Sequence, residues 1–405
     1  MTGDSSGTSD SSGTSDPTWA VLLDGPTADA ARRLVDTIAG LPDRAVPRAV
    51  RPDLGSGGAG LALAYHQLDL CRPGEGWRTM AVGHLDAAVR GAERMRLRSP
   101  GLLGGLGGLA FAAGRLGRPA AVRSDDHRAR SADRAVRPEG HQGLDLSSGL
   151  TGSGAVLLDR TDDPGTVARL RAVLTVLGRR VAAFPGESPG IAHGPAGPLA
   201  LLSSALSAGV EVPGQTAAIH RAVERLLEHR RDDDWGPDWS LRKDEEKEDQ
   251  DSGPAGNVNG PSLPASWCHG GPGIARALWL AGTALDDAPL RDLARGTLLA
   301  ALRRPPEVRR IDRRPGLCHG LAGLLLITLR FAQDPADPAF PAFRQAARAL
   351  ADRLITSTAD RMAARHEQAA AITPGLLDGA AGVLLVLLAA TTPVPPGWDR
   401  ALLLS

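Results

Sequence analysis

The sequence predicts an all-α protein whose fold is an α/α toroid, a ring of inner helices enclosed by a ring of outer helices. The first observation is a Gly-x-x-Gly step that opens a short apolar run at seven points, which start at Gly57, Gly105, Gly149, Gly194, Gly270, Gly320 and Gly379. The second is the spacing of these steps, about 45–75 residues, which is typical of repeat proteins. The third is that a polar, amphipathic segment separates most of the steps.

The segments between the steps are predicted to form the outer helices, because their apolar residues recur at i, i+3 and i+4 and arginines cover another face. These segments are 27–39, 77–95, 166–184, 215–231, 290–303 and 343–354. The shorter runs after the steps are apolar on most faces, so they must be buried as inner helices. Seven such pairs of helices would close into a double ring.

The glycine steps are predicted to be the corners that lead into the inner helices. Glycine suits a corner because it permits positive φ and lets the next helix approach closely. If every corner lies at one end of the ring, the residues before the corners converge there, together with the N-terminal amides of the inner helices. We therefore expect the functional site at that end.

One toroid domain is expected over 17–405, after a polar tail at 1–16 in which SSGTSD occurs twice and which is predicted to be disordered. Two segments interrupt the repeat. Segment 121–140 stands where the third outer helix is expected, but it is charged and poor in apolar residues, so it reads as a weak helix or a loop. Segment 232–266 is an acidic, Gly- and Pro-rich insertion. It reads as a solvated loop, or as a lid or peptide-docking loop beside the site.

The composition argues against several classes of function. The 405 residues carry a formal net charge of zero, which disfavours a nucleic-acid partner bound by bulk electrostatics. Aromatic residues make up 3% of the chain, which disfavours a sugar or single-strand binder that needs stacked rings. The sequence has no Gly-x-x-x-x-Gly-Lys loop, so a kinase or ATPase has no support.

The cysteines and the apolar segments indicate the cellular compartment in which the protein is expected. Three cysteines, Cys71, Cys268 and Cys318, give no disulfide framework and fit a reducing compartment. Cys71 has no partner motif and is expected to be a packed thiol. The first 16 residues lack the apolar region of a secretory signal, and the longest apolar stretch, 382–390, is too short to span a bilayer. We therefore expect a cytoplasmic protein.

Two Cys-His pairs, Cys268-His269 and Cys318-His319, precede equivalent corner glycines 50 residues apart. Zinc prefers thiolate and imidazole ligands in a tetrahedral array, and a catalytic zinc site keeps one of the four positions open. The two cysteines and one neighbouring histidine supply such a set of three ligands. The alternative is a pair of buried cysteines at helix starts with no metal.

Other polar residues stand near the corners. His193 precedes the fourth corner glycine as His269 and His319 precede the fifth and sixth. It is a candidate general acid or base, because histidine titrates near neutrality, and a capping or core histidine is the alternative. Asp145 lies four residues before the third corner and is expected to orient a histidine or ligand, or to be an N-cap. Asp378, before the seventh corner, is expected to be a helix cap.

These motifs resemble those of the lanthionine synthetase C-like family, the cyclases of lantibiotic biosynthesis. Segment 266–273, SWCHGGPG, resembles the family's Trp-Cys-x-Gly-x-Pro-Gly, and segment 317–323, LCHGLAG, resembles its Cys-His-Gly. Segment 191–194, IAHG, resembles its Ala-His-Gly, and segment 145–152 resembles its Asp-x-x-x-Gly-x-x-Gly. The four motifs occur in the family's order, and the resemblance extends from about residue 17 to the C-terminus.

The resemblance implies an α/α toroid with a zinc ion at its open end. It implies Cys268, Cys318 and His319 as the zinc ligands, His193 as the acid/base and Asp145 as the catalytic-site aspartate. The chain departs from the family at two places. His269 stands where members often have tyrosine, and segment 261–265 lacks the arginine that members often carry before the tryptophan. His269 is the candidate to replace that arginine in part when an enolate is stabilised.

The activity that the resemblance implies is zinc-dependent cyclisation of a ribosomally made precursor peptide. A cysteine thiolate of the peptide adds to a dehydroalanine or dehydrobutyrine of the same peptide, which gives a lanthionine or methyllanthionine thioether. No nucleotide or redox cofactor is required. The implied partners are the dehydrated precursor peptide and a separate dehydratase, with no nucleic acid. Peripheral association with a membrane-bound biosynthetic complex is left open.

Three alternatives also fit parts of the sequence. A relative that adds glutathione or another thiol to dehydroamino acids in proteins would use the same zinc site. An inactive scaffold that binds the precursor peptide would explain the missing arginine, although the intact ligand set argues against it. An α/α-toroid glycosidase needs paired corner carboxylates and several aromatic residues, and only Asp145 and Asp378 are available.

Overall fold

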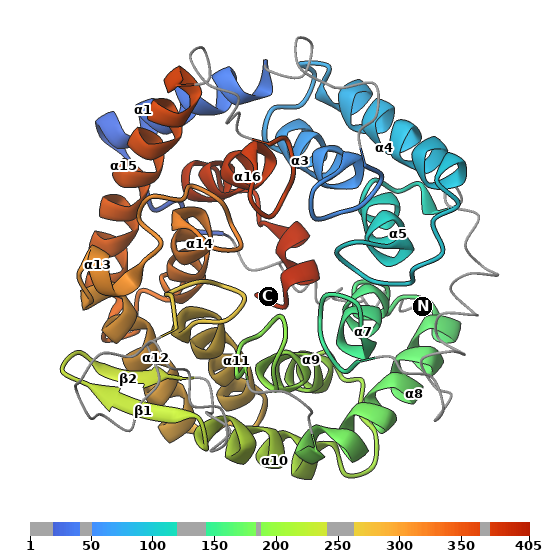
Figure 1. Ribbon diagram of the computed structural model, residues 1–405, viewed down its shortest axis with the longest axis vertical. Coiled ribbons are helices and arrows are strands. Elements are labelled where there is room, and N and C mark those ends of the chain that lie inside the picture. Colours follow the sequence, from blue (N-terminus) through green and yellow to red (C-terminus); the bar gives the residue numbers. More distant parts are fainter. Residues whose placement is uncertain (1–18, 41–50, 120–142, 184–187, 241–262, 365–372) are drawn as a thin grey trace, which may run out of the picture.

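The computed structural model describes residues 19–40, 51–119, 143–183, 188–240, 263–364 and 373–405. The described helices form the predicted α/α toroid (Figure 1). The inner ring contains α3 (Gly58–Cys71), α5 (Leu106–Arg115), α7 (Leu150–Leu158), α9 (Ala196–Ser207), α11 (Gly271–Ala284), α14 (Leu321–Phe331) and α16 (Ala380–Thr391). The outer ring contains α1 (Gly25–Ala39), α4 (Trp77–Arg94), α8 (Pro164–Arg180), α10 (Gln215–Leu227), α12 (Ala288–Arg303), the short α13 (Pro306–Arg309) and α15 (Phe340–Ala364).

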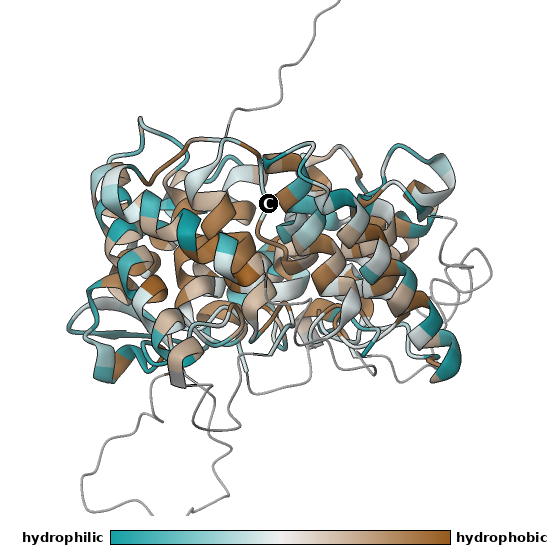
Figure 2. Cartoon of the chain, turned by 90° about the horizontal axis from the view of Figure 1, so that it is seen from above, coloured by the Kyte–Doolittle hydropathy of each residue, from teal (hydrophilic) through white to brown (hydrophobic). Residues whose placement is uncertain are grey.

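Burial separates the two rings as the sequence pattern predicts. Every residue of α16 is buried, whereas α10 buries one face and exposes the other. In Figure 2 the apolar residues gather on the inner helices and the polar residues on the outside. The apolar runs therefore form one continuous core, because each inner helix is enclosed by its neighbours and by an outer helix.

Three predicted helix ends are wrong. The helix expected over 166–184 ends as α8 at Arg180 and is followed by the 3-10 turn η2 (Val181–Ala183). The helix expected to end at residue 354 continues as α15 to Ala364. The helix expected over 215–231 ends at Leu227, because the chain turns into an antiparallel hairpin of β1 (Arg230–Asp233) and β2 (Gly236–Trp239). The buried Trp239 anchors the hairpin, since its indole N–H donates to the carbonyl of Leu226 at 3.0 Å.

Some expectations concern segments that the structure does not describe. The tail at 1–16 and the segment 121–140 lie outside the described residues. The insertion expected over 232–266 is described only at its two ends, where the hairpin occupies the first part and the loop before α11 the last. Its character as a solvated loop, a lid or a docking loop stays a prediction.

The corner glycines are required by lack of space, and the expectation that they have positive φ is wrong. None of them belongs to the positive-φ glycines of the described chain. At Gly320 φ is −145°, which any residue adopts, but a Cβ there would lie 2.2 Å from the carbonyl oxygen of Arg314. A Cβ on Gly323 would lie 2.0 Å from the carbonyl oxygen of Leu317. Both glycines of the step therefore let the preceding loop fold back over the N-terminus of the inner helix.

We call the stretch that ends at each corner glycine a corner loop, which gives seven loops in chain order. They are 51–57, 99–105, 143–149, 188–194, 264–270, 314–320 and 373–379. Each loop folds over the start of its inner helix, so all seven meet at the same end of the toroid.

Backbone hydrogen bonds join these loops into a ring. They run from Gly55 N–H to Leu103 (2.9 Å), Leu103 to Ser147 (3.1 Å), Leu146 to Ala192 (3.1 Å), Ala192 to Cys268 (3.1 Å), Cys318 to Leu377 (2.8 Å) and Leu377 to Gly55 (2.9 Å). No backbone hydrogen bond joins the fifth loop to the sixth, although every residue of both is described. There the Sγ of Cys268 instead lies 3.6 Å from the carbonyl oxygen of Cys318. The open place in the ring therefore falls between the two cysteine-bearing loops.

The interior of the inner ring is filled by the 3-10 turn η3 (Gly397–Leu402) and the residues after it (Figure 1). The indole N–H of Trp267 donates to the carbonyl of Leu402 at 3.2 Å, and the guanidinium of Arg276 donates to the carbonyl of Leu404 at 2.7 Å. This segment therefore supports the residue that precedes Cys268.

Candidate metal centre

Four side chains of the candidate centre occupy one repeat position, the residue immediately before the corner glycine. In the fourth to seventh loops these residues are His193, His269, His319 and Asp378. The ring centroids of His193 and His269 lie 5.0 Å apart, and those of His269 and His319 lie 6.3 Å apart. Nδ1 of His319 lies 3.4 Å from Oδ1 of Asp378. The repeat therefore places three imidazoles and a carboxylate in one arc along the rim.

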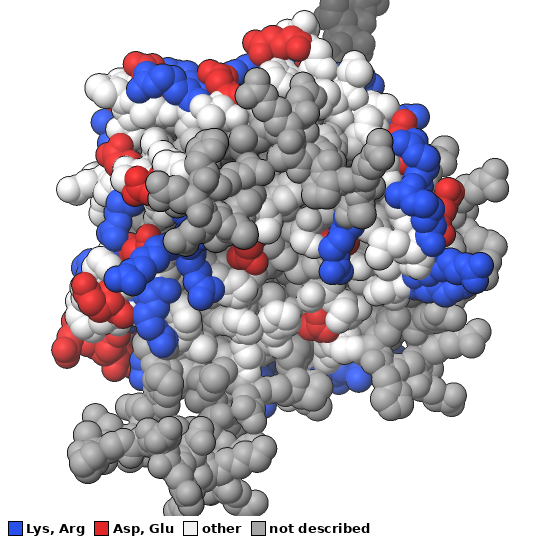
Figure 3. All heavy atoms as spheres, turned by 45° about the horizontal axis from the view of Figure 1, so that its top comes forward, with Lys and Arg blue, Asp and Glu red and all other residues white. Residues whose placement is uncertain are grey.

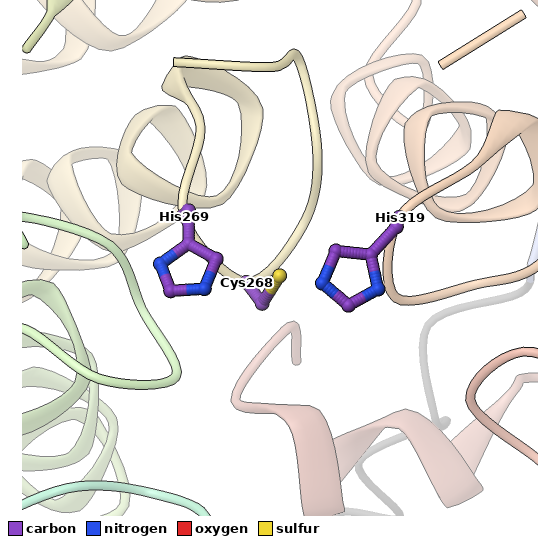
Figure 4. Close-up of side chains that lie close together, drawn as sticks. All are labelled: Cys268, His269 and His319. Carbon is purple, nitrogen blue, oxygen red and sulfur yellow. The ribbon is translucent and has the colours of Figure 1, made fainter. Parts of the chain in front are cut away.

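Cys268 lies between two of these imidazoles (Figure 4). One ligand atom each from Cys268, His269 and His319 lies within 4.8 Å of the other two. Cys318 is not part of this trio, but its Sγ lies 3.8 Å from Nε2 of His319. Cys268 and Cys318 are both buried, whereas the two imidazoles are partly exposed. The centre therefore has two thiols at its floor and imidazoles toward solvent.

The charges at the centre favour a thiolate at Cys268. The neighbouring Cys318 thiol donates to Cys268, and this bond, with help from His269 and His319, lowers the pKa of the Cys268 thiol. The same contact and burial raise the pKa of Cys318. Hydrogen bonding to Asp378 and then to Cys268 raises the pKa of His319 to about 10. Without a metal, these contacts therefore favour the thiolate at Cys268 and the protonated imidazole at His319.

The donor set fits a zinc ion. Thiolate sulfur and imidazole nitrogen are the ligands that zinc prefers, and soft thiolates disfavour magnesium or calcium. Among the described groups that shift the pKa of Cys268, His193 and His319 there is no arginine or lysine. The only cationic group among these partners is therefore an imidazole, and a bound metal ion would supply more positive charge to the buried Cys268 thiolate.

A family model of lanthionine synthetase C-like proteins matches residues 48–403. The chain belongs to the lanthionine synthetase C-like family.

A comparison with solved structures found a similar fold, and a comparison with curated sequences found no match. The structure of nisin cyclase is similar, with a TM-score of 0.71 and 20% sequence identity over 93% of this chain and 98% of that chain. At this identity the likeness shows the fold alone. No curated protein matches the chain significantly in sequence.

In this lanthionine synthetase C-like chain, Asp145 and His193 lie near the trio. Burial and the neighbouring His269 lower the pKa of His193, while the carboxylate of Asp145 acts in the opposite direction. Asp145 is not the N-cap of α7, which has no side-chain cap. Its Oδ1 accepts from the backbone N–H of Ser148 at 2.8 Å, so the carboxylate is held in the third loop and reaches His193 through its field.

Two residues beside the imidazoles were not predicted to contact them. Asp378 is not a helix cap, because α16 has no side-chain cap, and it contacts Nδ1 of His319 instead. Ser188 was not singled out, and its Oγ lies 3.0 Å from Nδ1 of His269. A signal exists in the sequence: Ser188-Pro189-Gly190 repeats the pattern of Arg314-Pro315-Gly316. Ser188 stands six residues before its corner glycine, as Arg314 does, so this repeat position indicates that Ser188 lies near the centre.

The remaining findings concern the surface. Within the described chain, no helix combines the length and the apolar character needed to cross a membrane. On the face drawn in Figure 3, the basic and acidic side chains of the described residues lie in mixed groups.

Proposed function

We propose that this chain is a zinc-dependent peptide cyclase that forms lanthionine or methyllanthionine rings. The observation that supports it best is the convergence of Cys268, Cys318 and His319, with His193 one imidazole away, at the open end of a toroid of this family. The substrate is a ribosomally made peptide that carries a cysteine and a dehydroalanine or dehydrobutyrine. A separate dehydratase would make the dehydroalanine or dehydrobutyrine from serine or threonine, because the residues of this centre have no proposed role in removing water.

Each residue has a role in this proposal. Cys268, Cys318 and His319 would hold zinc, which would supply a Lewis-acid centre able to lower the pKa of a substrate thiol. His193 takes the proton that the substrate thiol loses and returns it to the α-carbon after the sulfur has added to the β-carbon. The thiol loses one proton and the α-carbon gains one, so the reaction is an isomerisation that needs no cofactor besides the metal.

The enolate that forms during addition needs hydrogen-bond donors, and the rim has several. His269 lies beside His193 and can donate from Nε2 while Nδ1 accepts from the hydroxyl of Ser188, which lies 3.0 Å away. It would replace in part the arginine that segment 261–265 lacks. Asp145 acts on His193 through its negative field, which raises the pKa of His193 and so favours its protonated form.

The test is ring closure on a dehydrated peptide. Ring closure leaves the peptide mass unchanged, so the readout is loss of reaction with a thiol-capping reagent, measured by mass spectrometry after incubation with protein and zinc. We expect Cys318→Ala to abolish the loss and His193→Asn to slow it by about 10²–10⁴-fold. The matched control is Cys71→Ala, which removes a thiol on α3 outside the centre and should leave the rate unchanged.

The alternatives give different results in the same assay. With glutathione added, a glutathione transferase would raise the peptide mass by one glutathione, whereas a cyclase closes the ring without a mass change. A peptide-binding scaffold would retain the peptide on a column and leave its thiol free. Persistence of the free thiol with zinc-loaded protein would overturn the proposal.

A further inference from the structure

We propose that His269 is the fourth ligand of the metal in the peptide-free protein, and that the substrate sulfur displaces it. This inference rests on the proposed function. It starts from a difference between expectation and structure: the three ligand atoms that lie within 4.8 Å of one another belong to Cys268, His269 and His319, and His269 is not in the expected ligand set. A histidine that only faced the substrate would not need to lie this close to both metal ligands.

His269 is held so that one nitrogen is left for a metal. Nδ1 lies 3.0 Å from Oγ of Ser188, so Nε2 is the nitrogen left for Cys268 or for a metal. The backbone of His269 is fixed as well, because Ala192 N–H donates to the carbonyl of Cys268 at 3.1 Å. A Cβ on Gly190 would lie 2.4 Å from the Cα of His269, so the fourth loop packs directly against it. The fourth loop thereby sets both the position and the orientation of the imidazole.

The distances fit a closed site after small side-chain rotations. With metal–ligand bonds of about 2.0–2.3 Å, the ligand atoms of a tetrahedral site lie about 3.3–3.8 Å apart. Cys318 Sγ and His319 Nε2 already lie 3.8 Å apart, and the trio lies within 4.8 Å. Closing the trio from 4.8 Å to about 3.8 Å needs shifts of about an ångström, which side-chain rotations can supply, and Cys318 would join the same centre through its contact with His319. Such a set of two cysteines and two histidines is a closed zinc site.

Displacement would couple peptide binding to the release of His269 from the metal. The thiol gives its proton to His193 and takes the position of Nε2, so His269 leaves as a neutral imidazole and charge balances. The hydroxyl of Ser188 can accept from Nδ1 while His269 is a ligand and donate to Nδ1 afterwards. Once solvent has moved the proton of His269 from Nδ1 to the freed Nε2, Nε2 can donate a hydrogen bond to the enolate oxygen, while His193 still returns the proton to the α-carbon. His269 would thus protect the metal without peptide and serve the reaction with it.

The test uses cobalt(II) in place of zinc and the peptide-free protein, so it is independent of ring closure. The variants are His269→Asn, His269→Cys and, as the matched control, His193→Asn, which removes the neighbouring imidazole of the same arc. The absorption spectrum reports the coordination of cobalt, and the thiolate charge-transfer band counts bound sulfurs. The probe thiol is N-acetylcysteine methyl ester. Circular dichroism confirms that each variant is folded.

We expect His269→Asn to change the cobalt d–d bands or to lose the metal, and His269→Cys to retain it with one more thiolate. If His269 occupies the position about nine-tenths of the time, the probe thiol binds His269→Asn about tenfold more tightly than the wild type. His193→Asn should match the wild-type spectrum. Identical spectra and equal thiol affinities for wild type and His269→Asn would overturn the inference, whether or not the protein closes rings.

Discussion

At the scale of single residues, the position before each corner glycine determines what the loop can contribute to the rim. It is Ser56 in the first loop, His269 and His319 in the cysteine-bearing loops, and Asp378 in the seventh. Asp378 matters through His319, because its carboxylate lies 3.4 Å from Nδ1 and so favours the tautomer that offers Nε2 to a metal. The repeat thus supplies a metal ligand and its hydrogen-bond partner from consecutive loops.

Replacing Asp378 with alanine should weaken zinc binding about 10-fold, because the imidazole of His319 loses the partner that orients it. Asp378→Asn keeps a hydrogen-bond acceptor for His319 and should lose less zinc affinity than Asp378→Ala. Competition with a chelator measures the zinc affinity. Ser56→Ala, at the equivalent position of the first loop, is the control that should leave zinc affinity unchanged. Equal zinc affinities for Asp378→Ala and wild type would contradict this role.

The same contact predicts a pH dependence in the metal-free protein. The pKa of His319 is raised from 6.5 to about 10, first by Asp378 and then by Cys268, so the folded state holds this proton more tightly than the unfolded state. The resulting stabilisation is fully present below pH 6.5 and is lost as the pH rises through about 10. Asp378→Asn should move this loss to lower pH. NMR titration of His319 and urea unfolding across this range test it, and an unshifted His319 titration in the variant would refute it.

At the scale of elements, the corner loops hold one another except where the metal ligands lie. Backbone hydrogen bonds join each corner loop to the next from the first to the fifth, the sixth to the seventh, and the seventh to the first. No such bond joins the fifth loop to the sixth. Cys268 comes from the fifth loop and Cys318 and His319 from the sixth. A metal bound by these residues would therefore bridge the one open place among the described loops.

Removing the metal should loosen the fifth and sixth loops more than the others. Hydrogen exchange should rise in 264–270 and 314–320, while 99–105 and 143–149 change little, because backbone bonds to their neighbours remain. Zinc at about 100 times its Kd should stabilise the fold by about 2.7 kcal/mol. Exchange that rises evenly in all four segments, or in none, would contradict the bridging role.

The sequence predicts elements well where one pattern decides them. The α/α toroid and the corners follow from glycine steps and apolar runs that recur along the whole chain. The hairpin after α10 could not be predicted, because Arg230-Arg231-Asp232-Asp233 continues a polar helical pattern and the hairpin depends on tertiary partners. One of them is Arg304, whose guanidinium lies 2.9 Å from the carboxylate of Asp233. The contact of Asp378 with His319 escaped prediction for a related reason, since it joins neighbouring loops.

At the scale of the whole molecule, the segment inside the inner ring links the core to the centre. Arg330 on α14 binds both carboxylate oxygens of Asp399 in η3, at 2.7 and 2.6 Å, and the side chain of Asp399 is 0% exposed. Burial and the nearby Arg330 lower the pKa of Arg276 to about 9, and Asp399 offsets part of this effect. The buried carboxylate of Asp399 therefore offsets part of the charge of two guanidinium groups, the buried Arg276 and the partly buried Arg330.

Asp399→Ala should destabilise the fold by about 3–5 kcal/mol, because Arg330 and Arg276 would face each other without the carboxylate. Urea unfolding followed by circular dichroism measures the free energy of unfolding. Asp29→Ala, which breaks an exposed pair with Arg32, is the control and should cost about 0–1 kcal/mol. If the two variants lose similar stability, the buried pair does not have this role.

Zinc K-edge X-ray absorption on the purified protein tests the shared metal most directly. The account predicts two sulfur neighbours at about 2.3 Å with nitrogen neighbours at about 2.0 Å, and one sulfur fewer in Cys318→Ala. A single sulfur in the wild-type protein, or a spectrum that Cys318→Ala leaves unchanged, would contradict the claim that the fifth and sixth corner loops hold one ion between them.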